Sequence, residues 1–203
     1  MALFRAYKKS AKPKPVLADN MSCTAELCPN HPDLLLLRDA AADERNAIAF
    51  YLEASRSSCL PRLFLDVAED EMHHYVEIMR EVSRLDPVQA QMFGEEELDI
   101  LLMTRPLFKP KTKSDIRKEA ESADSQVIPP GRKEMPTVML ATKALTDELQ
   151  ATNKYQRYME TAEDPSVQRL FCHLMNEEKE HIAEFTAALF ELTHEPLPPE
   201  DES

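Results

Sequence analysis

The stretch "VAEDEMHHYVEIM" at residues 67–79 carries the residue types from which metal sites are built. Asp70 lies three residues before His73, and Glu71 lies three residues before His74. Residues three apart are neighbours on one face of an α-helix, so either pair could offer a carboxylate and an imidazole to one metal ion. A solvated, charged helix face is the competing interpretation of the same run.

A second copy of this pattern near the C-terminal end distinguishes the two pairs. The segments "RLFLDVAEDEMHHYVEIM" and "RLFCHLMNEEKEHIAEFT" align from their first residues. In that alignment Asp70 and His73 both fall on glutamates, so this pair has no second histidine. The other pair recurs as Glu-x-x-His, and it shares its face with the apolar residues of the helix. The repeated residues are Glu71, His74, Glu178 and His181.

The segments that precede these two motifs repeat as well. "DERNAIAFY" (43–51) and "DELQATNKY" (147–155) share an Asp-Glu pair and a tyrosine seven residues after the glutamate. Glu44 and Glu148 each lie on the apolar stripe of a predicted helix. The tyrosines, Tyr51 and Tyr155, could hydrogen-bond near a metal site, or could simply be core tyrosines that need a polar partner.

The geometry of a helical hairpin predicts that the four glutamates meet. In an antiparallel hairpin, residues equidistant from the turn lie side by side. The midpoint between Glu44 and Glu71 falls beside the helix breaker "SSCLP", and the midpoint between Glu148 and Glu178 falls within "AEDP". The two glutamates of each pair are therefore expected to lie side by side, near the middle of their helices. The six candidate metal ligands that converge are Glu44, Glu71, His74, Glu148, Glu178 and His181.

The charge of this set points to bound cations. Four carboxylates buried together would repel one another and lose their hydration, so a core of this kind is implausible without compensation. Two divalent cations would balance the four negative charges. The alternative, surface charges on amphipathic helices, does not explain why the acids lie on apolar stripes, duplicated and level.

Four long helices are expected to position these residues. The chain has only two glycines in 203 residues, and most of its fifteen prolines fall between periodic segments or in the tails. This pattern predicts an all-α fold, because folds with many tight turns usually need more glycine. The expected helices run from about Pro32 to "SRSSCLP", Pro61 to Leu85, Pro136 to Ala162 and Pro165 to Leu192.

The remaining segments divide the chain into an arm, a domain and a tail. We expect a flexible arm over residues 1–30, a helical domain over 31–193 and an acidic tail over 194–203. Within the domain, residues 86–135 form a long crossover between the second and third helices, with a short helix in "VQAQMFGEEELDILLM". Cys23, Cys28 and His31 could bind a soft metal together, but an ordinary flexible lead-in is the favoured interpretation, since no CxxC occurs.

Composition excludes several classes of function. The net charge of −13 argues against a nucleic-acid partner, because phosphate binding needs a basic face. The longest aliphatic run, "LLLL" at 34–37, is far shorter than the roughly 20 residues of a membrane span. The basic N-terminus lacks the apolar region of a signal peptide, so we expect a cytoplasmic protein, which we also expect to be a homodimer.

At these residues the chain resembles the ferritin-like superfamily of dinuclear carboxylate proteins, and rubrerythrin-type members in particular. That superfamily takes one glutamate from each of two helices and a Glu-x-x-His from each of the other two. The resemblance covers about residues 31–193 and implies a four-helix bundle with one long crossover. It also implies that Glu71 and Glu178 bridge two metals, that Glu44 and His74 complete one metal, and that Glu148 and His181 complete the other.

The chain departs from the rubrerythrin pattern in two ways. Rubrerythrins commonly carry an extra glutamate one turn along the third helix, whereas the positions three away from Glu148 are Leu145 and Ala151. They also commonly carry a rubredoxin module with two CxxC pairs, and this chain contains none. The resemblance therefore implies an electron donor supplied by another protein.

The resemblance implies a redox enzyme above other classes. Carboxylates with two imidazoles suit iron or manganese, and the absence of thiolate ligands disfavours zinc and copper. We expect two iron ions, with manganese as the alternative, and reduction of hydrogen peroxide or dioxygen; a dimanganese catalase belongs to the same class. Other candidates are a ferroxidase or iron-storage protein, a di-iron hydroxylase whose entrance is lined by "LDILLM", and a non-catalytic helical interaction protein.

Overall fold

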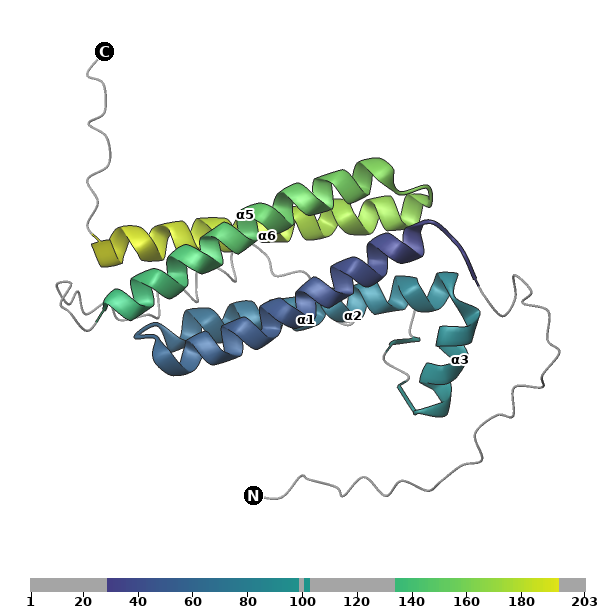
Figure 1. Cartoon of the computed structure of the whole chain (residues 1–203), viewed down its shortest axis with the longest axis horizontal. Helices are drawn as coiled ribbons and strands as arrows, with labels where there is room; N and C mark the ends of the chain where they lie inside the picture. Colours follow the sequence, from purple (N-terminus) through teal and green to yellow (C-terminus); the bar gives the residue numbers. More distant parts are fainter. Residues whose placement is uncertain (1–28, 99–100, 103–133, 194–203) are drawn as a thin grey trace, which may run out of the picture.

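Four long helices account for most of the computed structural model, which describes residues 29–98, 101–102 and 134–193 (Figure 1). Within these ranges there is no strand, so the all-α prediction is confirmed. A short helix follows the second long one. The helices are α1 (Asp33–Ser57), α2 (Pro61–Leu85), α3 (Pro87–Glu95), α5 (Met135–Thr161) and α6 (Pro165–Thr193).

Proline and aspartate set most of the helix boundaries. Proline stands in the first turn of α2, α3, α5 and α6, where its missing N–H is not needed. Asp86 ends α2 and caps α3, because its carboxylate accepts a hydrogen bond from the Gln89 backbone N–H at 3.0 Å. Pro32 is the capping residue of α1 and the helix begins at Asp33, which agrees with the predicted start near Pro32.

The long helices form two antiparallel hairpins that lie against each other. The first hairpin, α1 with α2, packs on the second, α5 with α6, through contacts of α1 with α5 and of α2 with α6 (Figure 1). The buried Asp33 side chain ties them at one end, because it accepts hydrogen bonds from the backbone N–H groups of Glu163 and Asp164, each at 2.9 Å. This contact holds the start of α1 against the turn of the second hairpin.

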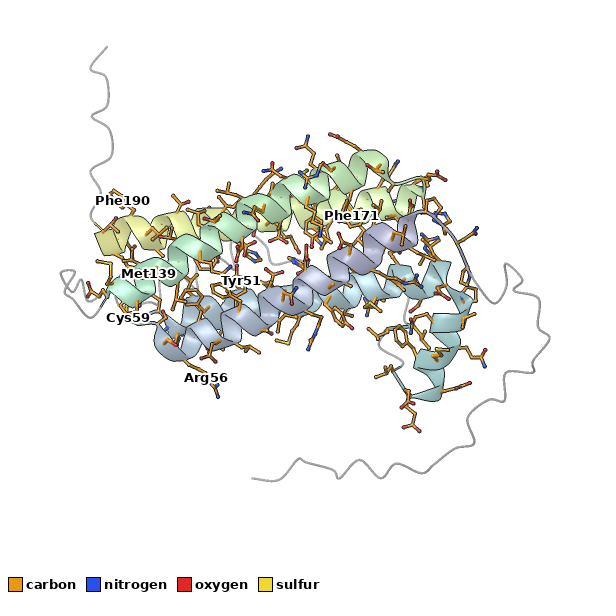
Figure 2. The ribbon with its side chains drawn as sticks, in the orientation of Figure 1. Tyr51, Arg56, Cys59, Met139, Phe171 and Phe190 are labelled. Atoms are coloured by element: carbon orange, nitrogen blue, oxygen red, sulfur yellow. The ribbon has the colours of Figure 1, made fainter. Side chains whose placement is uncertain are left out.

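Two apolar clusters fill the space between the hairpins. The first contains Leu37, Ile78 and Phe171 and lies towards the end marked by Asp33. The second contains Phe64 and Phe185 and lies towards the other end. On each of the four long helices, the candidate ligands fall between the residues that join one cluster and those that join the other. The ligands therefore occupy a polar layer in the middle of the core. Figure 2 labels Phe171 of the first cluster and Tyr51 of the second, which lie at different points along the bundle.

Several sequence predictions fall wholly or partly outside the described residues. The helix expected within the crossover corresponds to α3. Residues 1–28 of the arm, including Cys23 and Cys28, most of the remaining crossover and the tail at 194–203 are not described. None of the described helices combines the length and the apolar character needed to cross a membrane.

Candidate metal centre

Each of the four long helices contributes to one buried group of acids and histidines. A glutamate comes from α1 and another from α5, and a Glu-x-x-His pair comes from α2 and another from α6. None of the six residues is more than 3 % exposed. These six residues are the metal ligands predicted from the sequence: Glu44, Glu71, His74, Glu148, Glu178 and His181.

These residues form two overlapping sets of four. Glu44 and His74 join Glu71 and Glu178 in the first set, and Glu148 and His181 join the same two glutamates in the second. Within each set, one ligand atom from every residue lies within 4.8 Å of the others. Glu71 and Glu178 alone belong to both sets, which is the placement expected of ligands that bridge two metals.

The two histidines face the shared glutamates with the same ring atom. Nδ1 of His74 lies 3.0 Å from an oxygen of Glu71 and 3.4 Å from an oxygen of Glu178. Nδ1 of His181 lies 3.1 Å from Glu178 and 3.6 Å from Glu71. Because the lone pair of a neutral imidazole binds metal, Nδ1 is the atom that each histidine offers to this centre.

The outer edge of each histidine contacts a carboxylate from the other hairpin. Nε2 of His74 lies 2.8 Å from Glu177 on α6, and Nε2 of His181 lies 3.7 Å from Asp70 on α2. Such carboxylates fix the tautomer and orientation of a metal-binding imidazole. Sequence reasoning had placed Asp70 away from the site. Asp70 and Glu177 stand at equivalent positions of the repeat, which was the signal that could have identified them.

His73 does not join the ligands. Its Nδ1 lies 3.9 Å from Asp70, and His73 is only half-buried. His73 belongs to neither of the two sets of four. The structure therefore brings together the Glu71/His74 pair and leaves the Asp70/His73 pair outside the ligand layer.

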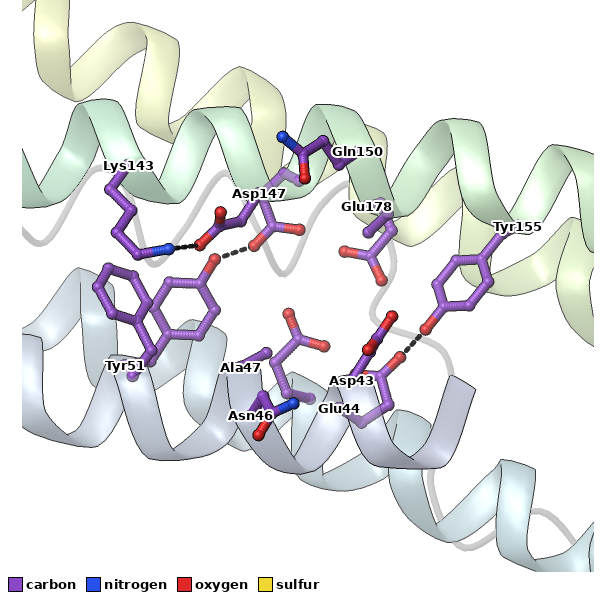
Figure 3. Close-up of a pocket in the computed structure, with 14 residues that line it drawn as sticks. Asp43, Glu44, Asn46, Ala47, Tyr51, Lys143, Asp147, Gln150, Tyr155 and Glu178 are labelled. Carbon is purple, nitrogen blue, oxygen red and sulfur yellow. Dashed lines mark hydrogen bonds and ion pairs between the residues drawn. The ribbon is translucent and has the colours of Figure 1, made fainter. Parts of the chain in front are cut away.

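Both predicted tyrosines reach across the interface between the hairpins. The Tyr51 hydroxyl donates a hydrogen bond to Glu148, and the Tyr155 hydroxyl donates one to Glu44 (Figure 3). Their rings are held by aromatic neighbours, since Tyr51 stacks on Phe185 with ring centroids 5.8 Å apart and Tyr155 makes a similar contact on its own side. The tyrosines thus orient the two glutamates that belong to one set each.

The pKa values of three carboxylates in this layer are strongly shifted. Burial, together with the nearby charge of Glu71, raises the pKa of Glu44 well above its usual value. Burial also raises the pKa of Glu148 to about 8, although a hydrogen bond with His181 opposes the shift. Burial would raise the pKa of Glu178 too, but its hydrogen bonds with His181 and His74 hold that pKa below the usual value.

The pKa values of both histidines in this layer are raised. Burial lowers the pKa of an imidazole, but contacts with Glu177, Glu178 and Glu71 raise the pKa of His74 well above its usual value. Asp70, Glu148 and Glu178 do the same for His181. The raised pKa values favour protons on Glu44, Glu148 and both histidines, all of which would bind a metal in their deprotonated form. This donor set fits two divalent cations, which would replace those protons.

A cavity of about 280 Å³ opens onto the carboxylates between α1 and α5 (Figure 3). Glu44, Glu71, Glu148 and Glu178 all line it, and neither candidate histidine does. The carboxylate side of the centre is therefore the accessible side.

No protein-family model, no curated protein and no solved structure matches this chain.

Proposed function

We propose that the chain is a ferritin-like, rubrerythrin-type protein whose centre holds two iron ions and reduces hydrogen peroxide. The observation that carries the proposal is the buried layer of four glutamates and two histidines, arranged as two sets of four that share Glu71 and Glu178. This ligand pattern is the one that defines dinuclear carboxylate centres in four-helix bundles. The pairing of two hairpins around the layer also supports assignment to that superfamily.

The donor set favours iron over softer metals. Oxygen donors with one imidazole for each metal suit iron or manganese, and none of the six ligands is a thiolate. Two Fe²⁺ ions bound here would supply the two electrons that reduction of hydrogen peroxide to water requires. A dimanganese centre is the alternative within the same class.

The protein side chains would hold the centre and manage its protons. Glu177 accepts a hydrogen bond from Nε2 of His74, and Asp70 lies 3.7 Å from Nε2 of His181; both carboxylates favour the tautomers whose Nδ1 lone pairs are directed inward. Tyr51 and Tyr155 donate to Oε1 of Glu148 and Glu44, and Oε2 of each glutamate faces a candidate histidine. The apolar clusters pack against the layer at both of its ends.

Peroxide is preferred to other substrates because of the doubled rubrerythrin-like motif and the small size of the cavity. Rubrerythrins commonly carry an extra glutamate one turn from the position of Glu148, whereas this chain has Leu145 and Ala151 there, so the metals would have one carboxylate fewer to exchange during oxidation. Turnover also requires an electron donor protein, because the chain contains no rubredoxin-type CxxC pairs. The proposed reaction of this chain alone is therefore the oxidation of its reduced centre by peroxide.

Metal analysis followed by rapid mixing tests the proposal. Protein loaded anaerobically with Fe²⁺ should retain two iron ions per chain after desalting. Stopped-flow mixing should then show faster oxidation by hydrogen peroxide than by dioxygen. Faster reaction with dioxygen, with iron accumulating beyond two per chain in an assembly far larger than a dimer, would instead establish a ferroxidase and storage role.

A further inference from the structure

The seam between α1 and α5 is built from residues that repeat. The segment 43–51 and the segment 147–155 face each other across the cavity, and five of their nine equivalent positions carry the same or a similar residue. Acids, amides, alanines and tyrosines therefore occur in pairs around the cavity (Figure 3). The pairs are Asp43 with Asp147, Glu44 with Glu148, Asn46 with Gln150, Ala47 with Ala151 and Tyr51 with Tyr155.

The two alanines account for the open space. Ala47 and Ala151 both line the cavity and are both partly exposed, whereas the tyrosines on the same helices are buried. An alanine on each helix leaves an opening that a longer side chain would fill. The resulting volume, about 280 Å³, lies just below the range of roughly 300 to 1,000 Å³ that is typical of pockets for drug-sized ligands.

Two lysines pair with acids beside the cavity. Lys143 forms an ion pair with Asp147, and Lys154 forms one with Asp43 and another with Asp39 at 2.8 Å. The Nζ atom of Lys143 lies 4.8 Å from the ring centroid of Phe50, and that of Lys154 lies 5.3 Å from the ring centroid of Tyr158. Three acids thus share two lysines, and four glutamates line the cavity itself, so the metal-free opening disfavours an anionic reactant.

We propose that the α1–α5 seam is the entrance through which a small, uncharged oxidant reaches the carboxylate side of the metals, and that Ala47 and Ala151 set its width. This inference rests on the proposed function and adds a substrate class to it: hydrogen peroxide passes, and bulky organic hydroperoxides do not. The placement of both histidines away from the cavity supports it, because a reactant that enters here meets the carboxylates and the metals directly.

Leucine substitutions at the two alanines test the entrance. Ala47→Leu, Ala151→Leu and the double variant would fill the opening, and Ala49→Leu on the exposed side of α1 is the matched control. Alanine and leucine have similar helix propensities, so α1 and α5 should persist. All variants should bind two Co²⁺ ions per chain at equilibrium. Azide binding to the Co²⁺-loaded protein, followed by its visible absorption, should slow about tenfold or more in the double variant only.

The oxidation of the Fe²⁺-loaded protein supplies a second measurement that needs no variant. Hydrogen peroxide should oxidise the wild-type centre at least about tenfold faster than cumene hydroperoxide, because the aromatic oxidant has to pass between Ala47 and Ala151 to bring its peroxide group to the carboxylates. Equal rates with the two oxidants, or a metal-loaded double leucine variant that takes up azide like the wild type, would overturn the entrance. Failure of the wild type to bind two metals would overturn the proposed function itself and is therefore a different result.

Discussion

Glu71 and Glu178 differ from the other four candidate ligands because each belongs to both sets. We therefore expect Glu71→Ala or Glu178→Ala to lose most of both metals, whereas Glu44→Ala should lose mainly one. Elemental analysis of desalted protein measures the difference. If both Glu71→Ala and Glu178→Ala retained two metals per chain, neither glutamate would be a bridge.

Two neighbouring histidines provide an internal control for the helix phase. His74 is buried with Nδ1 towards the shared glutamates, whereas His73 is half-buried and outside both sets. His74→Ala should weaken binding of one metal by at least the 10- to 100-fold that is typical when a supporting residue is lost. His73→Ala should leave it nearly unchanged. Competition titrations with Co²⁺ and a chelator compare the metal affinities of the two variants. An equal loss of affinity in both would contradict the assigned face of α2.

Protons should leave the layer when metals enter it. Glu148, with a pKa of about 8, should hold a proton at pH 7 in the metal-free protein, and burial raises the pKa of Glu44 as well. Since metal ligands must be deprotonated, the affinity for Co²⁺ should rise as the pH increases towards about 8 and change less above it. A pH indicator in weakly buffered solution should record proton release on loading at pH 7. Uptake without proton release would mean that these carboxylates are already ionised.

At the scale of the element, Asp33 determines how α1 meets the second hairpin. Its buried carboxylate accepts two backbone N–H groups from the turn between α5 and α6. Asp33→Ala would leave both donors without this acceptor and should lower the free energy of unfolding by about 2 to 3 kcal/mol. Asp33→Asn, which keeps one acceptor oxygen, should lose less. Chemical denaturation of the metal-free proteins gives both values, and an unchanged Asp33→Ala variant would show that the tie is weak.

The sequence predicts the helices better than the contacts between them. Prolines, apolar periodicity and the repeated Glu-x-x-His are local signals, and they locate every long helix and all six candidate ligands. The partners of His74 and His181 were missed because Glu177 and Asp70 lie on the opposite hairpin. Such contacts depend on how the hairpins are rotated against each other, and no periodicity within one helix encodes that rotation.

At the scale of the whole molecule, bound metals should join the two hairpins. Each set of four takes side chains from both hairpins. An ion that binds only the folded state stabilises that state by about 2.7 kcal/mol when its free concentration is 100 times its dissociation constant. Loading should therefore raise the melting temperature, and chelation should reverse the change. Glu44→Gln resembles the protonated acid of the metal-free layer, so it should melt like the metal-free wild type yet respond less to Co²⁺. A full response by this variant would contradict the role of Glu44.

The crossed tyrosine contacts have a consequence for how the protein is made. Tyr51 and Glu148 are 97 residues apart in the chain, and Glu44 and Tyr155 are 111 apart. At synthesis rates of roughly 5 to 20 residues per second, the first hairpin leaves the ribosome on the order of 5 to 20 seconds before its partners. During that interval it carries Glu44, Glu71 and His74 without their counterparts. Under the proposed function, metal insertion therefore has to wait for the second hairpin, because until then the nascent chain carries only three of the six candidate ligands.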